Sequence, residues 1–377
     1  MHFETFWAVV SKLVFGSAFY VIYRIIIKSC SNPTYDFDEL EASKNYMNKY
    51  CPVGETAFGK GIFVMNIGWL SMVPSLLYFL VFRKAKSDPK SYGTRAMGLI
   101  AVPSAIDMVA TALSTYGNPW ISLSLAFIFK GGRVVFSAIL TVSLLRRKLY
   151  MHHWVAVVTC IVGLIVAASS QLLMEPSACW GVVLVLGSEL FKALRIVIEE
   201  RLMKNDSFEP TFLVGIEGVY GSAVFTIALF VAWLGVSGSE GGSFENLPDT
   251  FSRIRESSLL IALFCILPPI TCIMSITSAV VTRNLSAVHN GLISVVRIGV
   301  LWIFELVIYS SFKGSGFGKQ IGEPWTQYSW LKLMGLLIVV FSTLLYDEDV
   351  KLPCIFKYSK DEEETSKAVK DSLDPNI

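Results

Sequence analysis

Apolar residues occur in long runs separated by short polar segments along almost the whole chain. A bilayer core about 30 Å thick requires roughly 20 mostly apolar residues in a spanning helix. The runs do not alternate strictly between apolar and polar residues, as the strands of a membrane β-barrel would. Ten runs satisfy the requirement, at residues 4–27, 58–82, 94–116, 119–145, 150–171, 178–203, 211–235, 258–281, 285–311 and 328–346. The pattern predicts an all-α integral membrane protein with ten transmembrane helices.

Composition supports this prediction. Of the 377 residues, 53% are apolar and only 16% are charged, whereas soluble domains carry roughly 25% charged residues. The formal net charge of +2 is small, and no basic tract is long enough to follow a phosphate backbone. We therefore expect the lipid bilayer as a partner and no nucleic acid.

Basic residues in the loops predict the orientation of the chain. They cluster in the 83–95 and 146–148 loops, and basic loops stay on the cytosolic side of a membrane. An even number of spans then puts both termini in the cytosol. The segment 347–377 is acidic and poor in apolar residues, which predicts a disordered cytosolic tail.

The cysteines predict one disulfide and no metal site. Cys30 and Cys51 share the 28–57 loop, which this orientation puts in the lumen, where an oxidising environment favours a bridge. Two free thiols are the alternative. The other cysteines are scattered without Cys-x-x-Cys or Cys/His spacing, so we expect neither a metal nor a cofactor.

Three short motifs of the first five predicted spans recur in the same order in the last five. Val102-Pro103-Ser104 corresponds to Leu267-Pro268-Pro269, Arg133 to Arg297, and Gly163 to Gly335. Because each half has an odd number of spans, the two halves have opposite orientation, as in many transporters. The sequence thus predicts two inverted five-helix repeats, residues 1–172 and 173–346, followed by the tail.

Six charged residues are expected near the middle of the membrane, about 16–21 Å along their spans at 1.5 Å per residue. Charge at this depth is costly and indicates a functional site. An excess of arginine and lysine favours a substrate with a carboxylate or phosphate group, and we expect Asp107 to orient the cations. The predicted substrate-binding residues are Asp107, Lys130, Arg133, Glu189, Lys192 and Arg297.

Some of these charges have a simpler interpretation. Glu189 and Lys192 are three positions apart, and Arg195 and Glu199 four, so each pair can form an ion pair on one helix. Two further residues are candidates for proton coupling. These are Glu217, which we also expect to pair with Arg297, and His289, for which a polar helix cap is the alternative.

The chain resembles a known family of membrane proteins. Four stretches carry the resemblance: 103–108, the Arg133-centred span that ends at 145–149, 199–201 with 217–221, and Arg297 with Trp302. They are similar to the drug/metabolite transporter superfamily and, within it, to the solute carrier 35 family, subfamily F. Nucleotide-sugar transporters and chloroquine-resistance-type transporters are related families within this superfamily. The long 28–57 loop, and the lack of a four-cysteine loop between spans 7 and 8, depart from the chloroquine-resistance type.

The sequence and the resemblance together predict a secondary active transporter of a small anionic or zwitterionic molecule, working by alternating access. Alternatives are a nucleotide-sugar/nucleotide antiporter, a proton-coupled exporter of amino acids, peptides or drugs from an acidic organelle, or a receptor or scaffold. With four histidines and Asp107 as the only aspartate in a span, we do not expect an enzyme. The expected location is an endomembrane of Golgi, lysosomal or vacuolar type, as a monomer or homodimer.

Overall fold

The described part of the chain is almost entirely helical. The computed structural model describes residues 3–35, 51, 54–83, 94–117, 121, 129, 131–145, 151–172, 179–205, 208–238, 240–311 and 324–346. Its helices are α1 (Phe3–Lys28), α3 (Gly61–Leu70), α4 (Val73–Tyr78), the π-helical turn η1 (Phe79–Arg83), α5 (Thr94–Gly117), α7 (Gly132–Leu145), α8 (Met151–Leu172), α9 (Cys179–Asn205), α10 (Pro210–Leu234), α11 (Leu247–Glu256), α12 (Ser258–Asn284), α13 (Ala287–Ser311) and α15 (Ser329–Tyr346). Two short strands, β1 (Cys30–Ser31) and β2 (Thr56–Ala57), form an antiparallel pair.

The predicted spans all contain helix, and several meet the stricter requirements for crossing a membrane. Six helices of the described chain are long and apolar enough, namely α1, the α3–η1 segment, α5, α10, α12 and α15. The apolar parts of α7, α8 and α13 are shorter, and α9 is long but rich in charge. Large apolar side chains lie exposed on several of these helices, for example Ile227 and Leu234 at 65% and 73%. Such surface is stable against lipid, and the chain is a multi-pass membrane protein.

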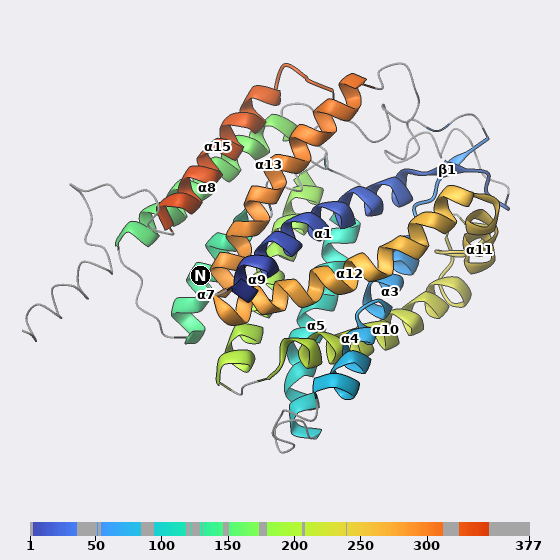
Figure 1. Cartoon of the computed structure of the whole chain (residues 1–377). Helices are drawn as coiled ribbons and strands as arrows, with labels where there is room; N and C mark the ends of the chain where they lie inside the picture. Colours follow the sequence, from blue (N-terminus) through green and yellow to red (C-terminus); the bar gives the residue numbers. More distant parts are fainter. Residues whose placement is uncertain are drawn as a thin grey trace, which may run out of the picture.

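Long helix pairs organise the bundle. The most extensive contacts join α8 to α15, α5 to α9, and α1 to α12, and α10 packs across α3 and α4. Figure 1 shows α1 and α12 side by side, and α8 beside α15 at the other edge of the bundle. The strands and α11 lie together at one end, which we call the hairpin end.

The second predicted span is interrupted. The helix stops between α3 and α4, where the Ser71 hydroxyl donates to the carbonyl of Gly68, and Pro74 begins the next segment. Proline has no backbone N–H to donate and clashes with the preceding turn, which favours a break here, although α5 and α12 continue through Pro103 and Pro268-Pro269. Glycines of α10 then allow close packing on this broken region, since a Cβ at Gly221 would lie 2.1 Å from the Trp69 ring.

Cys30 and Cys51 form a disulfide at the hairpin end, across a sequence separation of 21 residues. The bridge joins Cys51 to β1, the strand that contains Cys30, and β1 in turn pairs with β2. Closing a loop of this length stabilises the folded state chiefly by restricting the unfolded chain.

We expect the Cys30→Ser/Cys51→Ser double variant to lose about 3 kcal/mol of stability, the value of the chain-entropy model for such a loop. Thermal unfolding in detergent measures the loss. In the wild type, neither thiol should react with a membrane-impermeant maleimide until a reductant is added. Labelling of both thiols without reductant would show that the bridge is absent.

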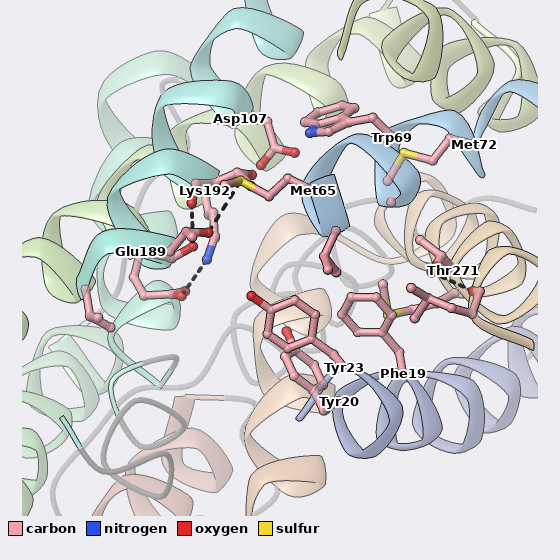
Figure 2. Close-up of a pocket in the computed structure, with 18 residues that line it drawn as sticks. Phe19, Tyr20, Tyr23, Met65, Trp69, Met72, Asp107, Glu189, Lys192 and Thr271 are labelled. Atoms are coloured by element: carbon pink, nitrogen blue, oxygen red, sulfur yellow. Dashed lines mark hydrogen bonds and ion pairs between the residues drawn. The ribbon is translucent and has the colours of Figure 1, made fainter. Parts of the chain in front are cut away.

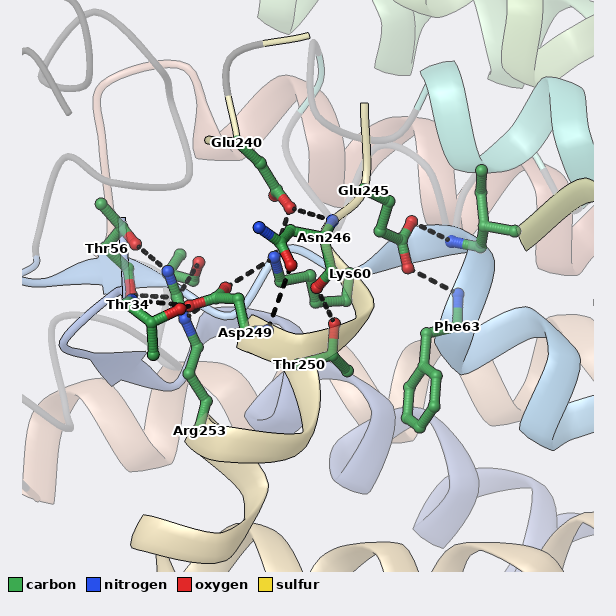
Figure 3. A network of polar contacts seen from close by, with 12 residues as sticks. Thr34, Thr56, Lys60, Phe63, Glu240, Glu245, Asn246, Asp249, Thr250 and Arg253 are labelled. Carbon is green, nitrogen blue, oxygen red and sulfur yellow. Dashed lines mark hydrogen bonds and ion pairs between the residues drawn. The ribbon is translucent and has the colours of Figure 1, made fainter. Parts of the chain in front are cut away.

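Charged side chains at the hairpin end form a buried network, seen in Figure 3. The Nζ of Lys60 pairs with Glu240 and lies 2.8 Å from Oδ2 of Asp249. Arg253 lies 2.9 Å from the same carboxylate oxygen and donates from Nη2 to the hydroxyl of Thr56 at 2.9 Å. The network therefore links β2 and the start of α3 to α11.

Glu245 stabilises the start of α3. Its carboxylate accepts the backbone N–H groups of Ile62 (3.0 Å) and Phe63 (2.8 Å), two of the donors that a helix N-terminus leaves unpaired. Burial raises the pKa of Glu245 to about 7, although the two N–H groups act in the opposite direction. The folded protein therefore binds this proton more tightly than the unfolded chain does.

The raised pKa predicts a pH-dependent stability. Glu245 makes its full contribution to the free energy of unfolding below about pH 4.5, and this contribution is lost as the pH rises through about 7. Between these values the carboxyl group keeps its proton in the folded state but loses it in the unfolded chain. At about 1.4 kcal/mol per pH unit, the whole window is worth about 3 kcal/mol. Melting temperatures of the wild type should fall across it, and Glu245→Gln should remove most of this slope. An unchanged slope in the variant would contradict the assignment.

Candidate functional site

A cavity of about 200 Å³ lies inside the bundle, between α1, α3, α5, α9 and α12. Figure 2 shows Phe19, Tyr20 and Tyr23 together on one side of it and Glu189 and Lys192 on another, with Trp69 beside Asp107. Its lining residues are Phe19, Tyr20, Tyr23, Val64, Met65, Gly68, Trp69, Met72, Asp107, Thr111, Ser114, Thr115, Val185, Glu189, Lys192, Leu267, Thr271 and Met274. An apolar cavity with a few polar groups is the usual form of a small-molecule site.

Glu189 is the junction of the first charged cluster. Its Oε2 accepts from Nε and Nη2 of Arg133 at 2.8 and 2.5 Å, and its Oε1 accepts from Lys192 at 3.1 Å. The side chain of Glu189 is 1% exposed, whereas Arg133 and Lys192 are 13% and 19% exposed. The Glu189–Lys192 pair within α9 is therefore present as expected, but the same carboxylate also binds a second helix.

Arg195 organises the second cluster. Its Nη1 lies 2.7 Å from Oδ2 of Asp107, its Nε pairs with Glu199, and its Nη2 lies 3.5 Å from Oε2 of Glu217. The expectation that Asp107 orients Arg133 is wrong, because Asp107 faces α9 and is bound there by Arg195. Glu217 likewise lies beside Arg195 and not beside Arg297, so the expected Glu217–Arg297 pair does not form.

Arg297 has an unusual environment for a buried cation. It is 5% exposed, and its guanidinium lies 4.8 Å from the centre of the Tyr20 ring, a cation–π contact. Within the described residues, no carboxylate lies within ion-pair distance of Arg297. The nearby charges include Arg133 and Lys12, which are also positive, as well as Glu189.

Lys12 is a buried charged residue near Arg297 and Arg133 that the sequence reasoning missed. It is 3% exposed in α1 and donates from Nζ to the backbone carbonyl of Asn290 at 2.9 Å. The side chain of Asn290 is itself held by Ser278 and Thr282. A lysine inside the apolar run 4–27 was the available signal. Lys130, another predicted binding residue, lies outside the described residues.

His289 lies away from the cavity lining, in the first turn of α13. Its Nδ1 is 2.7 Å from the hydroxyl of Ser286, which also accepts the backbone N–H of His289 at 3.2 Å. Ser286, which precedes α13, therefore caps this helix, and the His289 ring contacts the capping hydroxyl.

The geometry defines a class of protein: a multi-pass helical membrane protein with a buried, charge-lined cavity. Solute carrier family 35 member F6 of Rattus norvegicus is 24% identical to the chain over 261 residues, and that of Homo sapiens is 23% identical. Each match covers 66% of this chain and 66% of the relative, just under two thirds of its length. The chain is thus a distant homologue of a solute carrier 35 subfamily F protein, as the sequence motifs predicted.

Other comparisons extend this result. An uncharacterized protein of Schizosaccharomyces pombe is 19% identical over 287 residues, which cover 74% of this chain and 84% of that protein. A protein crystal structure superposes with a TM-score of 0.52 at 9% identity, over 93% of this chain and 100% of its own, and this likeness concerns the fold alone. No protein-family model matches the chain. Solute carriers are generally not enzymes, in agreement with the expectation for this chain.

Proposed function

We propose that the chain is a secondary active transporter that moves a small anionic or zwitterionic molecule across an endomembrane by alternating access. The observation that carries the proposal is the cavity between α1, α3, α5, α9 and α12, with charged side chains on one wall. Buried charge in a membrane bundle is costly and is retained where it binds a substrate or ion.

The proposal includes ten spans in two inverted repeats. If α1 corresponds to α9 and α5 to α12, a two-fold operation converts the pair α1–α12 into the pair α9–α5, and both pairs are among the most extensive in the bundle. The same operation maps the pairs α8–α15 and α10 with α3 and α4 onto themselves. Such pairing is what inverted repeats produce.

Particular residues support the same symmetry. Gly163 of α8 and Gly335 of α15, which correspond in the proposed repeat, contact each other, since a Cβ at Gly163 would lie 3.0 Å from the carbonyl oxygen of Gly335. The four helices α1, α5, α9 and α12, which form the two equivalent pairs, all contribute to the cavity. The substrate then lies between the two halves, where rocking of one against the other alternates access.

The charges around the cavity indicate the substrate class. On one side, Lys12, Arg133, Lys192 and Arg297 lie near Glu189; on the other, Asp107, Glu199 and Glu217 lie around Arg195. Of these residues, Asp107, Glu189 and Lys192 line the cavity, and the others are not among its lining residues. The basic side suits a carboxylate or phosphate, which arginine binds with two parallel hydrogen bonds. The acidic side suits a substrate ammonium group, and the aromatic residues of α1 suit an apolar body.

Orientation and location are part of the proposal. The hairpin end faces the lumen and both termini face the cytosol, in accordance with the basic loops. A tag at either terminus should be accessible only from the cytosol, and a tag in the 236–246 segment only from the lumen. Termini on opposite sides would exclude ten spans.

Uptake into proteoliposomes tests the function. The wild type should accumulate at least one of four labelled probes, UDP-glucose, glutamate, lysine or chloroquine, several-fold above empty vesicles. UDP-glucose would favour a nucleotide-sugar antiporter, and uptake of the others with a pH gradient a proton-coupled exporter. Transport of none of them, in either gradient direction, by folded protein would favour a receptor or scaffold. Light scattering of the purified protein would decide between monomer and homodimer.

A further inference from the structure

Three carboxyl groups from three helices surround a single guanidinium group. Asp107 of α5, Glu199 of α9 and Glu217 of α10 all approach Arg195, whose side chain is 21% exposed. The three acids are much more buried, at 8%, 3% and 1% exposed. If all three were ionised, two negative charges would remain uncompensated inside the membrane bundle, which is strongly unfavourable.

Glu217 is the least compensated of the three. Apart from the 3.5 Å approach to Arg195, neither of its carboxylate oxygens has a hydrogen-bond partner within the described residues. Yet it is 1% exposed, so water does not replace the missing donors. A carboxyl group in such surroundings is more stable when it carries or shares a proton.

Neighbouring elements bring no further charge to Glu217. α3 and α4 contain no charged residue, and the only one in α12, Arg283, pairs with Glu209 at 3.1 Å. α5 contributes Asp107 and α9 contributes Arg195 and Glu199. The other titratable side chains of these elements form no hydrogen bond or ion pair with Glu217 in the described chain; they are Tyr78, Arg95, Tyr116, Cys179, Glu189, Lys192, Glu200, Arg201, Lys204, Cys265 and Cys272.

A bound proton would reduce this negative charge. Within the described residues, no group of three His, Cys, Asp or Glu side chains is arranged to hold a metal. Asp107 alone of the three acids lines the cavity. A proton needs no coordination space and can pass between carboxyl groups through hydrogen bonds. We propose that Asp107, Glu199 and Glu217 around Arg195 form a proton-binding site that couples transport to a proton gradient.

Arg195 connects this site to the cavity. With a proton shared by Glu199 and Glu217, the guanidinium remains bound to Asp107, as in the structure. When the proton leaves, the two glutamates compete for the guanidinium, and Asp107 becomes available to a cationic group of the substrate. The coupling part rests on the proposed transport function, whereas proton binding does not.

Infrared spectroscopy tests proton binding without any transported molecule. At neutral pH, the C=O band of protonated carboxyl groups should be present in the wild type and reduced in Glu217→Gln, Glu199→Gln or both. Glu200→Gln is the matched control, because Glu200 is equally buried in α9 but bound by Lys204 and the Ala287 N–H. Its band should equal that of the wild type. If neither Glu199 nor Glu217 variant loses intensity while folded, the proton site is wrong.

Transport of the four labelled probes tests the coupling. For each probe that the wild type transports, a pH gradient should change the rate several-fold, and Glu217→Gln should abolish this gradient dependence while exchange at equal pH persists. Gradient-independent transport by the wild type would overturn the coupling. If no probe is transported but the carboxyl band behaves as expected, the proton site stands and the transport function fails.

Discussion

Replacing Arg297 by glutamine is expected to reduce transport about 30-fold or more, because losing one partner of a buried charge contact costs at least about 2 kcal/mol. It should leave the folded protein equally stable or more stable. Arg297 is buried near Lys12 and Arg133, and its closest described partner is the ring of Tyr20. Removing it relieves repulsion between cations and, among the described residues, loses the cation–π contact and the weaker attraction to Glu189. Uptake by proteoliposomes and thermal unfolding in detergent measure the two effects.

A gain or preservation of stability together with loss of function is the pattern of a binding residue. A purely structural arginine would show the reverse, a lower melting temperature with normal transport by the protein that remains folded. That result would remove Arg297 from the substrate site. Arg283→Gln is a suitable control, because Arg283 lies at the end of α12 and is 38% exposed in its pair with Glu209. It should change neither quantity appreciably.

The second large effect concerns stability alone. Arg253→Gln is expected to destabilise the protein by about 3 kcal/mol, since breaking a buried ion pair leaves an uncompensated charge. Arg253 is 1% exposed and bound to Asp249, and its Nη2 also donates to Thr56. Lys60 stays 2.8 Å from Asp249, which limits the loss. Thermal unfolding measures the change.

Arg255→Gln is the matched control for Arg253. Both arginines belong to α11, but Arg255 is exposed, and a surface substitution of this kind changes stability by about 0.5 kcal/mol or less. Equal effects of the two substitutions would show that the network at the hairpin end contributes little. A larger effect of Arg253→Gln confirms that the network joins β2 to α11.

Features that depend on neighbours along the chain were predictable from the sequence. The apolar runs predicted where helices form, because a spanning helix requires a minimum length of apolar residues. The Glu189–Lys192 and Arg195–Glu199 pairs followed from helical spacing, since residues three and four apart lie on one face. Proline marks where a helix can break but does not decide it, because the chain breaks before Pro74 and continues through Pro103 of α5.

Only the tertiary structure decided which charges meet between helices. Asp107 binds Arg195 and not Arg133, Glu217 lies beside Arg195 and not Arg297, and Lys12 lies near Arg297, another cation. The depth of a residue in the membrane follows from its position in a span, and this is why a common depth for these charges could be predicted from the sequence. The direction of its side chain depends on the rotation and crossing of each helix, which the packing of whole apolar and small-residue faces determines. One charged side chain adds little to that packing, and its sequence position therefore does not identify its partner.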